Sequence, residues 1–304
     1  MNGDILVEYY LGIDGGGTKT TAAVSDEKGN IITKKVGKTI NFYSVGMDKA
    51  RENLLEVIEE IYKETGEITF ESVFVGCSAL DREADAETLT RLCGGIRANR
   101  IKMDSDLYVA LKSVENAFCP CVAICGTGSM AIGEDEQGNI KFKGGWGHII
   151  GDEGSGYVIA VNALKCCAIF DDSGEASPLL DSAKEYFGVE DFRQAIDKIY
   201  SPDTSKDVLA GFAQNVQKVA EEGDVFAQSI IVNEAHNFAR TVFSLLGEIE
   251  KCSVLALYGG VFQHNGLFRD TFTEDINEIY PDIEVRLLDI PPEEGALKIA
   301  REMK

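Results

Sequence analysis

The sequence is poor in positive charge. It has 29 Lys and Arg residues against 51 Asp and Glu residues, which gives a formal net charge of −22 over 304 residues. Nucleic acids and anionic membranes are bound through an excess of Lys and Arg that neutralises phosphate groups. We therefore expect no nucleic acid and no membrane among the partners, and we attribute the acidic surface to solubility.

Long apolar runs and export signals are also missing. No stretch of about 20 apolar residues could span a bilayer, and no positively charged N-terminus leads into an apolar signal core. We therefore expect a cytoplasmic protein, in which the eight cysteines are reduced. The cluster CPCVAIC (119–125) is predicted to be core rather than a metal site, because no C-x2-C pair occurs elsewhere.

Several common site motifs are absent as well. The sequence has no G-x-x-x-x-G-K-[ST], which excludes a P-loop. It has no G-x-G-x-x-G opening a helix after a strand, which disfavours a dinucleotide fold. The three His residues have no metal-ligand spacing and are predicted to be structural. Proline is scarce and no low-complexity linker occurs, so a hinge near residues 115 and 290 would be built from ordered elements.

What the sequence does contain is a repeated pattern of strand, glycine turn and strand. The first copy begins with YYLGID (9–14) and continues through TTAAVSD and IITKKVG. The second copy, CVAICGTGSMAIGEDEQGNIKFKGG, covers residues 121–145. Both copies contain an acidic turn, DEKGNI at 26–31 and DEQGNI at 135–140. Such a repeat predicts two domains with a similar core.

The rest of the chain mixes helical and strand patterns, which indicates an α/β protein. Residues 47–64 carry apolar side chains at helical spacing and predict an amphipathic helix. Residues 72–79 predict a buried strand, and residues 81–93 predict a helix with an acidic first turn. Further helices are expected over 154–169, most of 206–250 and 293–304, with a strand over 254–261.

Three glycine-rich turns each follow an apolar, strand-like run. They are GGGT (15–18), GTGS (126–129) and LYGGV (257–261). A turn without side chains lets backbone N–H groups approach an anion closely. One such turn is most often a tight hairpin. Three of them, two within a repeated unit, indicate a polyphosphate held between two domains.

These motifs resemble a known family. Asp14 with GGGTKT, the GTGS turn and GGWGHIIGDEGSGY (144–157) are similar to the BadF/BadG/BcrA/BcrD-type ATPase family, which includes the eukaryotic-type N-acetylglucosamine kinases. The resemblance extends from about residue 9 to residue 300. It implies two ribonuclease-H-like domains of the actin, sugar kinase and Hsp70 superfamily around an ATP cleft. The N-terminal domain would comprise residues 1–115 and 290–304, and the C-terminal domain residues 116–289.

The resemblance also implies a function. We expect ATP-dependent phosphorylation of an amino sugar, N-acetylglucosamine or a close relative such as N-acetylmuramic acid, with ATP and Mg²⁺ as cofactors. The expected partner is the small-molecule sugar, in a homodimer. An ATPase that activates a reductase or dehydratase is the main alternative. A non-catalytic sugar sensor is a weaker one, since no helix-turn-helix precedes residue 9. A ROK-type kinase would usually carry a Cys-rich zinc loop, which is missing.

Residue roles for the nucleotide follow from the same resemblance. Asp14 would hold Mg²⁺ beside the phosphates, with a turn-capping role as the alternative. The ATP-binding residues would be the glycines and polar residues of the three turns, namely Gly15, Gly16, Gly17, Thr18, Lys19, Thr127, Gly128, Ser129, Gly259 and Gly260.

The catalytic base should be a carboxylate that takes the proton of the acceptor hydroxyl. IKMDSDLYVAL (101–111) offers Asp104 and Asp106. In the family the base opens a helix after a strand, so Asp106 is preferred and Asp104 stays the alternative. The substrate-binding residues would be Asn41, Asp106, Gly128 and Asp152, with a helix N-cap as the other interpretation of Asp152. Met130 replaces the Asn that many N-acetylglucosamine kinases carry after GTGS.

Overall fold

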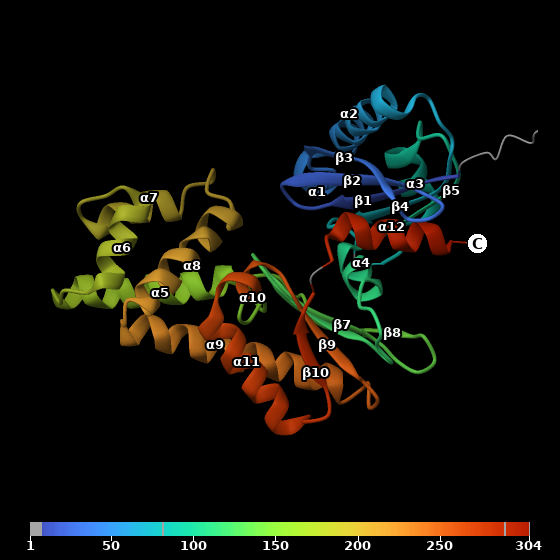
Figure 1. Ribbon diagram of the computed structural model, residues 1–304. Coiled ribbons are helices and arrows are strands. Elements are labelled where there is room, and N and C mark those ends of the chain that lie inside the picture. The colour runs from blue at the N-terminus through green and yellow to red at the C-terminus, as the bar shows by residue number, and fades with distance from the viewer. Residues whose placement is uncertain (1–7, 81, 289, 304) are drawn as a thin grey trace, which may run out of the picture. The chain divides into compact units, whose positions relative to one another are not determined.

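The computed structural model describes residues 8–80, 82–288 and 290–303. The chain divides into two compact units, one of residues 1–115 with 288–304 and the other of residues 116–287. Each unit contains a mixed five-stranded sheet covered by helices (Figure 1). The α/β fold class predicted from the sequence is therefore confirmed. Within the described residues, no helix is both long and apolar enough to cross a bilayer.

The sheet of the first unit has the strand order β3-β2-β1-β4-β5. An antiparallel meander is formed by β1 (Tyr9–Gly15), β2 (Lys19–Asp26) and β3 (Ile31–Lys38). The strands β4 (Phe70–Cys77) and β5 (Ala98–Asp104) extend the sheet parallel to β1. Three parallel strands therefore end at the same edge of this sheet.

Helices cover both faces of the first sheet (Figure 1). The helix α2 (Met47–Thr65) buries its apolar stripe on one face, as the sequence predicted, and α3 (Ala86–Cys93) packs beside it. The helix α3 is shorter than expected, because Asp85 caps its N-terminus. On the other face lie α4 (Asp106–Lys112) and α12 (Pro292–Glu302), which pack against β1 and β4. A short helix, α1 (Phe42–Val45), precedes α2.

The sheet of the second unit has the order β10-β9-β6-β7-β8. The strands β6 (Cys121–Cys125), β7 (Ser129–Glu134) and β8 (Ile140–Gly144) form an antiparallel meander. The strands β9 (Val254–Tyr258) and β10 (Glu284–Leu287) continue the sheet parallel to β6. The second sheet thus has the strand arrangement of the first, so the repeat seen in the sequence corresponds to a repeated meander.

Helices make up most of the second unit. They are α5 (Gly156–Ser173), α6 (Pro178–Phe187), α7 (Ala195–Ile199), α8 (Lys206–Glu221), α9 (Val225–Leu246), α10 (Gly260–His264) and α11 (Gly266–Ile279). The helix predicted over most of 206–250 is two helices, α8 and α9, and α6, α7 and α11 were not predicted.

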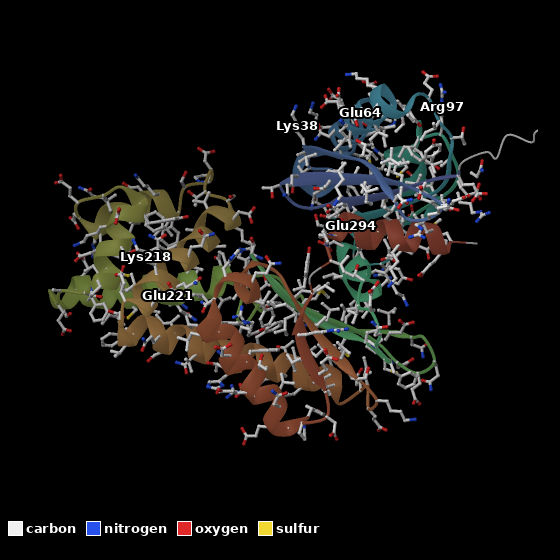
Figure 2. All side chains as sticks on the ribbon, in the orientation of Figure 1. Lys38, Glu64, Arg97, Lys218, Glu221 and Glu294 are labelled. Atoms are coloured by element: carbon white, nitrogen blue, oxygen red, sulfur yellow. The ribbon has the colours of Figure 1, made fainter. Side chains whose placement is uncertain are left out.

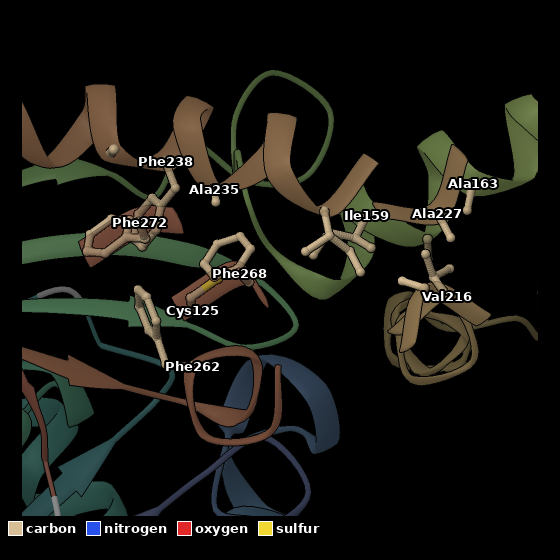
Figure 3. Close-up of a cluster of buried hydrophobic side chains, with 14 of the residues drawn as sticks. Cys125, Ile159, Ala163, Val216, Ala227, Ala235, Phe238, Phe262, Phe268 and Phe272 are labelled. Atoms are coloured by element: carbon tan, nitrogen blue, oxygen red, sulfur yellow. The ribbon is translucent and has the colours of Figure 1, made fainter. Parts of the chain in front are cut away.

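The core of the second unit joins these helices to the sheet. Phe238 of α9, Phe262 of α10, and Phe268 and Phe272 of α11 gather near Cys125 of β6 (Figure 3). Seven of the eight cysteines are buried in the two units, and Cys166 is half-buried. The prediction that the cysteines of the 119–125 cluster are core residues is therefore confirmed. His236 pairs with Asp275 at 2.6 Å, which agrees with a structural role for that histidine.

The contact between β1 and α12 leaves no room for a side chain at Gly12. An ideal Cβ there would lie 2.5 Å from the Glu293 carbonyl oxygen and even closer to the Leu297 amide nitrogen. We predict that Gly12→Ala forces the helix away from the strand and destabilises the first unit by roughly 1–3 kcal/mol. Thermal unfolding measures this loss as a lower Tm.

The matched control is Gly17→Ala. Apart from Gly17 and its two chain neighbours, no described residue has an atom within 4 Å of an ideal Cβ at Gly17, so this variant should unfold at the wild-type temperature. A wild-type Tm for Gly12→Ala would contradict the close packing of α12 on β1.

Candidate functional site

The carboxyl edge of the first sheet brings two acidic residues together. The strand register aligns Asp14 with Gly76, and Gly76 with Asp104. Asp106 is the first residue of α4 and follows the end of β5 by two residues. Asp14, near the end of the central strand β1, and Asp106, at the start of α4, therefore lie at the same edge of the sheet.

The surroundings of Asp14 disfavour its ionised form. Burial raises the pKa of Asp14 to about 7, and the negative charges of Asp106 and Glu293 add to the rise, while Lys19 opposes it. Burial also raises the pKa of Asp106, although the Leu107 amide counteracts this. The carboxylate of Asp14 accepts no hydrogen bond from the residues that the structure describes. This position is therefore suited to a cation that would stabilise the charged form.

The turn after β1 leaves backbone amides exposed. Gly15 is a glycine for packing reasons, because an ideal Cβ would lie 2.5 Å from the Ile40 side chain. Gly17 faces open space instead. The Gly16 carbonyl accepts a hydrogen bond of 2.7 Å from the Thr39 hydroxyl, which fixes the turn. The amides of Gly16 and Gly17 have no hydrogen-bond partner within the described ranges, so they can bind an anion.

Asn41 has a local function that the sequence did not predict. Its side-chain oxygen caps α1 by accepting hydrogen bonds from the amides of Tyr43 and Ser44 at 3.1 and 3.2 Å. Its side-chain nitrogen donates to the Ser78 hydroxyl at 3.1 Å. Because the amide nitrogen carries two hydrogens, one N–H remains for a ligand.

In the second unit, hydrogen bonds within the turn and to the loop before α5 fix the turn between β6 and β7. The Gly126 amide donates to the Gly128 carbonyl at 2.9 Å, and the Ser129 hydroxyl donates to the Glu153 carbonyl at 2.6 Å. The amides of Thr127 and Gly128 make no hydrogen bond to any described residue. The available donors of this turn are thus the amides of Thr127 and Gly128, whereas the Ser129 hydroxyl is already engaged.

Asp152 lies directly beneath this turn. It is 4% exposed, and its backbone adopts a left-handed conformation with φ of 62°. Its carboxylate accepts a hydrogen bond of 2.7 Å from Lys206 and lies 3.4 Å from the Ser129 amide. The N-cap interpretation of Asp152 is wrong, because Ser155 caps α5. Lys206 was missed, since its partner is 54 residues away and no local pattern links the two.

A cavity of about 650 Å³ opens beside the same turn. Its wall includes Thr127, one side of α8 and the helix α10. Lys218 and Glu221, which line it from α8, are labelled in Figure 2. Sites for drug-sized ligands typically measure about 300–1,000 Å³. His264 also lines the cavity.

The third glycine turn follows β9. Gly259 has φ of 106°, and an ideal Cβ there would lie 2.8 Å from the Cys125 carbonyl carbon. A glycine is therefore required at this position by the backbone of β6. Gly260, by contrast, borders the cavity.

One family model matches most of the chain. The model of the BadF/BadG/BcrA/BcrD ATPase family matches residues 11–300. The chain belongs to this family. The resemblance of the chain to this family, expected from about residue 9 to residue 300, is thereby confirmed.

Two kinases match this chain along nearly their whole length. The N-acetyl-D-glucosamine kinase of Dictyostelium discoideum is 30% identical, over 98% of this chain and 99% of the relative. The N-acetylmuramic acid/N-acetylglucosamine kinase of Clostridium acetobutylicum is 28% identical, over 97% of this chain and 99% of the relative.

Solved structures share the fold. A structure from Chromobacterium violaceum, described as a candidate N-acetylglucosamine kinase, has a TM-score of 0.76 at 20% identity and covers 97% of this chain and 99% of its own. A ROK family glucokinase from Streptomyces griseus has a TM-score of 0.61 at 17% identity, with 97% and 100% covered. The fold expected from the resemblance, that of the actin-like sugar kinases, is therefore confirmed.

The site residues expected from the sequence fall into two groups. The first unit carries Asp14, Gly15, Gly16, Gly17, Thr18, Lys19, Asn41 and Asp106, and the second carries Thr127, Gly128, Ser129, Asp152, Gly259 and Gly260. Sequence reasoning missed Glu293 near Asp14, Lys206 beside Asp152, and the α8 side of the cavity. In each case the residues that come together are distant in the sequence, so no local pattern links them.

The raised pKa of Asp14 predicts a pH-dependent cost in stability. Because the pKa of Asp14 is about 7 in the folded chain, its proton is held up to that pH, whereas the unfolded chain releases it near the ordinary aspartate pKa of 3.8. The free energy of unfolding therefore falls as the pH rises through this window. We predict that Asp14→Asn, measured without ligand, has a higher Tm than wild type at pH 8.

The comparison across pH is the control. At pH 4 the Asp14 side chain of the folded protein is protonated and uncharged, so the difference in Tm between Asp14→Asn and wild type should shrink as the pH is lowered from 8 to 4. A difference that is the same at every pH would contradict the electrostatic origin of the cost.

Proposed function

We propose that the chain is an ATP-dependent kinase of an amino sugar, with N-acetylglucosamine or a close relative such as N-acetylmuramic acid as the acceptor. The observation that carries the proposal is the pair of Asp14 and Asp106 at one sheet edge, next to a turn with free amides. Nearly full-length similarity to kinases named for these two sugars supports the choice of acceptor.

Asp106 would act as the base. As the acceptor hydroxyl oxygen attacks the γ-phosphorus, the bond to the bridging oxygen of ADP breaks and Asp106 takes the hydroxyl proton. The Ser105 hydroxyl caps α4 by accepting a hydrogen bond of 3.1 Å from the Tyr108 amide, which fixes the backbone at Asp106. Asp104 suits the role of base less well, because its carboxylate already accepts a hydrogen bond of 2.6 Å from the Ser105 amide.

Asp14 would hold Mg²⁺. No group of three or more His, Cys, Asp and Glu in the described ranges could bind a metal ion alone. Mg²⁺ commonly binds to one or two carboxylates and takes its remaining ligands from phosphates and water. The half-buried carboxylate of Asp14, without a hydrogen-bond partner among the described residues, fits that requirement. The bound ion would neutralise charge on the phosphates and relieve the cost of ionising Asp14.

The cavity beside α8 and the glycine turns would bind the nucleotide. We assign the nucleoside to the cavity of about 650 Å³ beside α8 and α10. Gly260 lines this cavity, and Gly259 precedes it at the N-cap of α10. The phosphates would be bound by the amides of the first two glycine turns that have no partner among the described residues, together with Thr18 and Lys19. Ser129 would contribute little through its hydroxyl, which donates to Glu153.

The acceptor sugar would be bound by Asn41, Asp106, Gly128 and Asp152. Asn41 offers one side-chain N–H, since its other polar groups cap α1 and bond Ser78. Met130 lies against Gly145, where an ideal Cβ would be 3.0 Å from the Met130 methyl carbon. Methionine cannot supply the hydrogen bond of an asparagine, so the sugar pocket would tolerate relatives of N-acetylglucosamine. A homodimer and a cytoplasmic location remain predictions.

We predict that Asp106→Asn lowers the rate of sugar phosphorylation by about 10²–10⁴-fold, because the amide cannot accept the hydroxyl proton. Binding of Mg·ATP should stay near the wild-type affinity. A coupled assay of ADP release with sugar present measures the rate, and titration calorimetry measures the affinity.

Asp104→Asn is the matched control, because it removes a carboxylate two residues away. It should keep most of the turnover. Wild-type turnover by Asp106→Asn would show that Asp106 is not the base, and loss of turnover by Asp104→Asn alone would transfer the role to Asp104.

A further inference from the structure

We infer that Lys206 binds the terminal phosphates of the nucleotide at the glycine turn of the second unit. This inference rests on the proposed ATP site and adds a cation to it. Lys206 is the first residue of α8, the helix that also lines the cavity assigned to the nucleoside. No sequence motif marks this lysine.

The ammonium group lies against the middle of the turn. An ideal Cβ at Gly128 would be 3.1 Å from Lys206 Nζ and 3.0 Å from Asp152 Oδ2. The amides of Thr127 and Gly128, in the same turn, have no hydrogen-bond partner among the described residues. Two free backbone N–H groups beside an ammonium group are the donors that a phosphate oxygen requires.

Asp152 holds the ammonium group in this place. The Asp152 side chain is 5% exposed and the Lys206 side chain 30%, and their ion pair measures 2.7 Å. Asp152 is itself fixed by its left-handed backbone and by its contact with the Ser129 amide. The long, flexible lysine side chain is therefore kept at the turn before any ligand arrives, which lowers the entropic cost of binding.

The Asp152 carboxylate repels a phosphate. A phosphate at the turn is therefore attracted only if it lies closer to the Lys206 ammonium group than to this carboxylate. The exposed fractions favour the lysine, because the Asp152 side chain is only 5% exposed whereas the Lys206 side chain is 30% exposed. An ammonium group has three N–H donors, and in the described part of the chain only Asp152 accepts one from Lys206. The other two remain for phosphate oxygens.

The competing explanation is a purely structural ion pair that fastens α8 to the turn. The two explanations differ in which nucleotides they affect. A phosphate contact acts on ADP and ATP but not on AMP, if the α-phosphate does not reach the turn. Fastening of α8 shapes the whole cavity and affects all three nucleotides equally.

The test is the affinity of Lys206→Met for AMP, ADP and ATP, measured by titration calorimetry in the presence of Mg²⁺. We expect ADP and ATP to bind about tenfold or more weakly, AMP to bind within about twofold of wild type, and Lys206→Arg to retain most of the affinity. Lys165→Met, which removes an exposed lysine from α5, is the control for loss of charge and should bind all three nucleotides normally.

A double variant separates lost attraction from an orphaned carboxylate. Lys206→Met leaves the buried Asp152 unpaired, which could itself repel phosphate or destabilise the fold. Lys206→Met combined with Asp152→Asn removes both charges and should still bind ADP weakly. Wild-type ADP affinity in the double variant, equal losses for all three nucleotides, or no loss in Lys206→Met would each overturn the inference.

Failure of this inference is distinguishable from failure of the proposed function. Nucleotide affinities are measured without sugar. If wild type binds ADP but phosphorylates no amino sugar, the proposed acceptor is wrong and the assignment of Lys206 can still be judged from its own variants.

Discussion

The constraint on which the site depends is the electrostatic cost of Asp14. The parallel strands of the first unit end at one edge, so the fold places Asp14 and Asp106 together there, and α12 adds the charge of Glu293. Burial and two neighbouring acids raise the pKa of Asp14 to about 7. A carboxylate that is costly to ionise in the empty protein is a strong ligand for a divalent cation, because the cation removes that cost.

The second unit has the same strand arrangement, but the feature at the end of its first strand is a rigid glycine turn. Its first turn is fixed by the loop before α5, and that loop is anchored by Glu234, which is 5% exposed. Glu234 accepts the Gly154 amide at 2.9 Å and the Asn162 side chain at 3.0 Å. The turn is therefore held rigidly while the amides of Thr127 and Gly128 stay free. The second unit thus presents backbone donors at the edge of its own sheet.

Local patterns in the sequence predicted the strands of both meanders and the helix α2, because strand alternation and helical spacing are local properties. The roles expected of Asp14 and Asp106 came from the family resemblance, and the local pattern agreed with it because Asp14 lies near the end of a strand and Asp106 opens a helix. Local patterns could not predict Lys206 beside Asp152 or Glu293 near Asp14, because these contacts join distant parts of the chain. The capping role of Asn41 was hidden for another reason, since α1 has only four residues and no periodicity.

The most direct measurement follows the γ-phosphate of ATP. Wild-type protein is incubated with Mg²⁺ and γ-labelled ATP, with N-acetylglucosamine, N-acetylmuramic acid or no sugar, and the labelled product is identified. An amino-sugar kinase transfers the label to one of the sugars, and ADP release without sugar is slow by comparison. Label that appears only as inorganic phosphate, at a rate that neither sugar changes, would contradict the kinase and indicate an ATPase coupled to another protein.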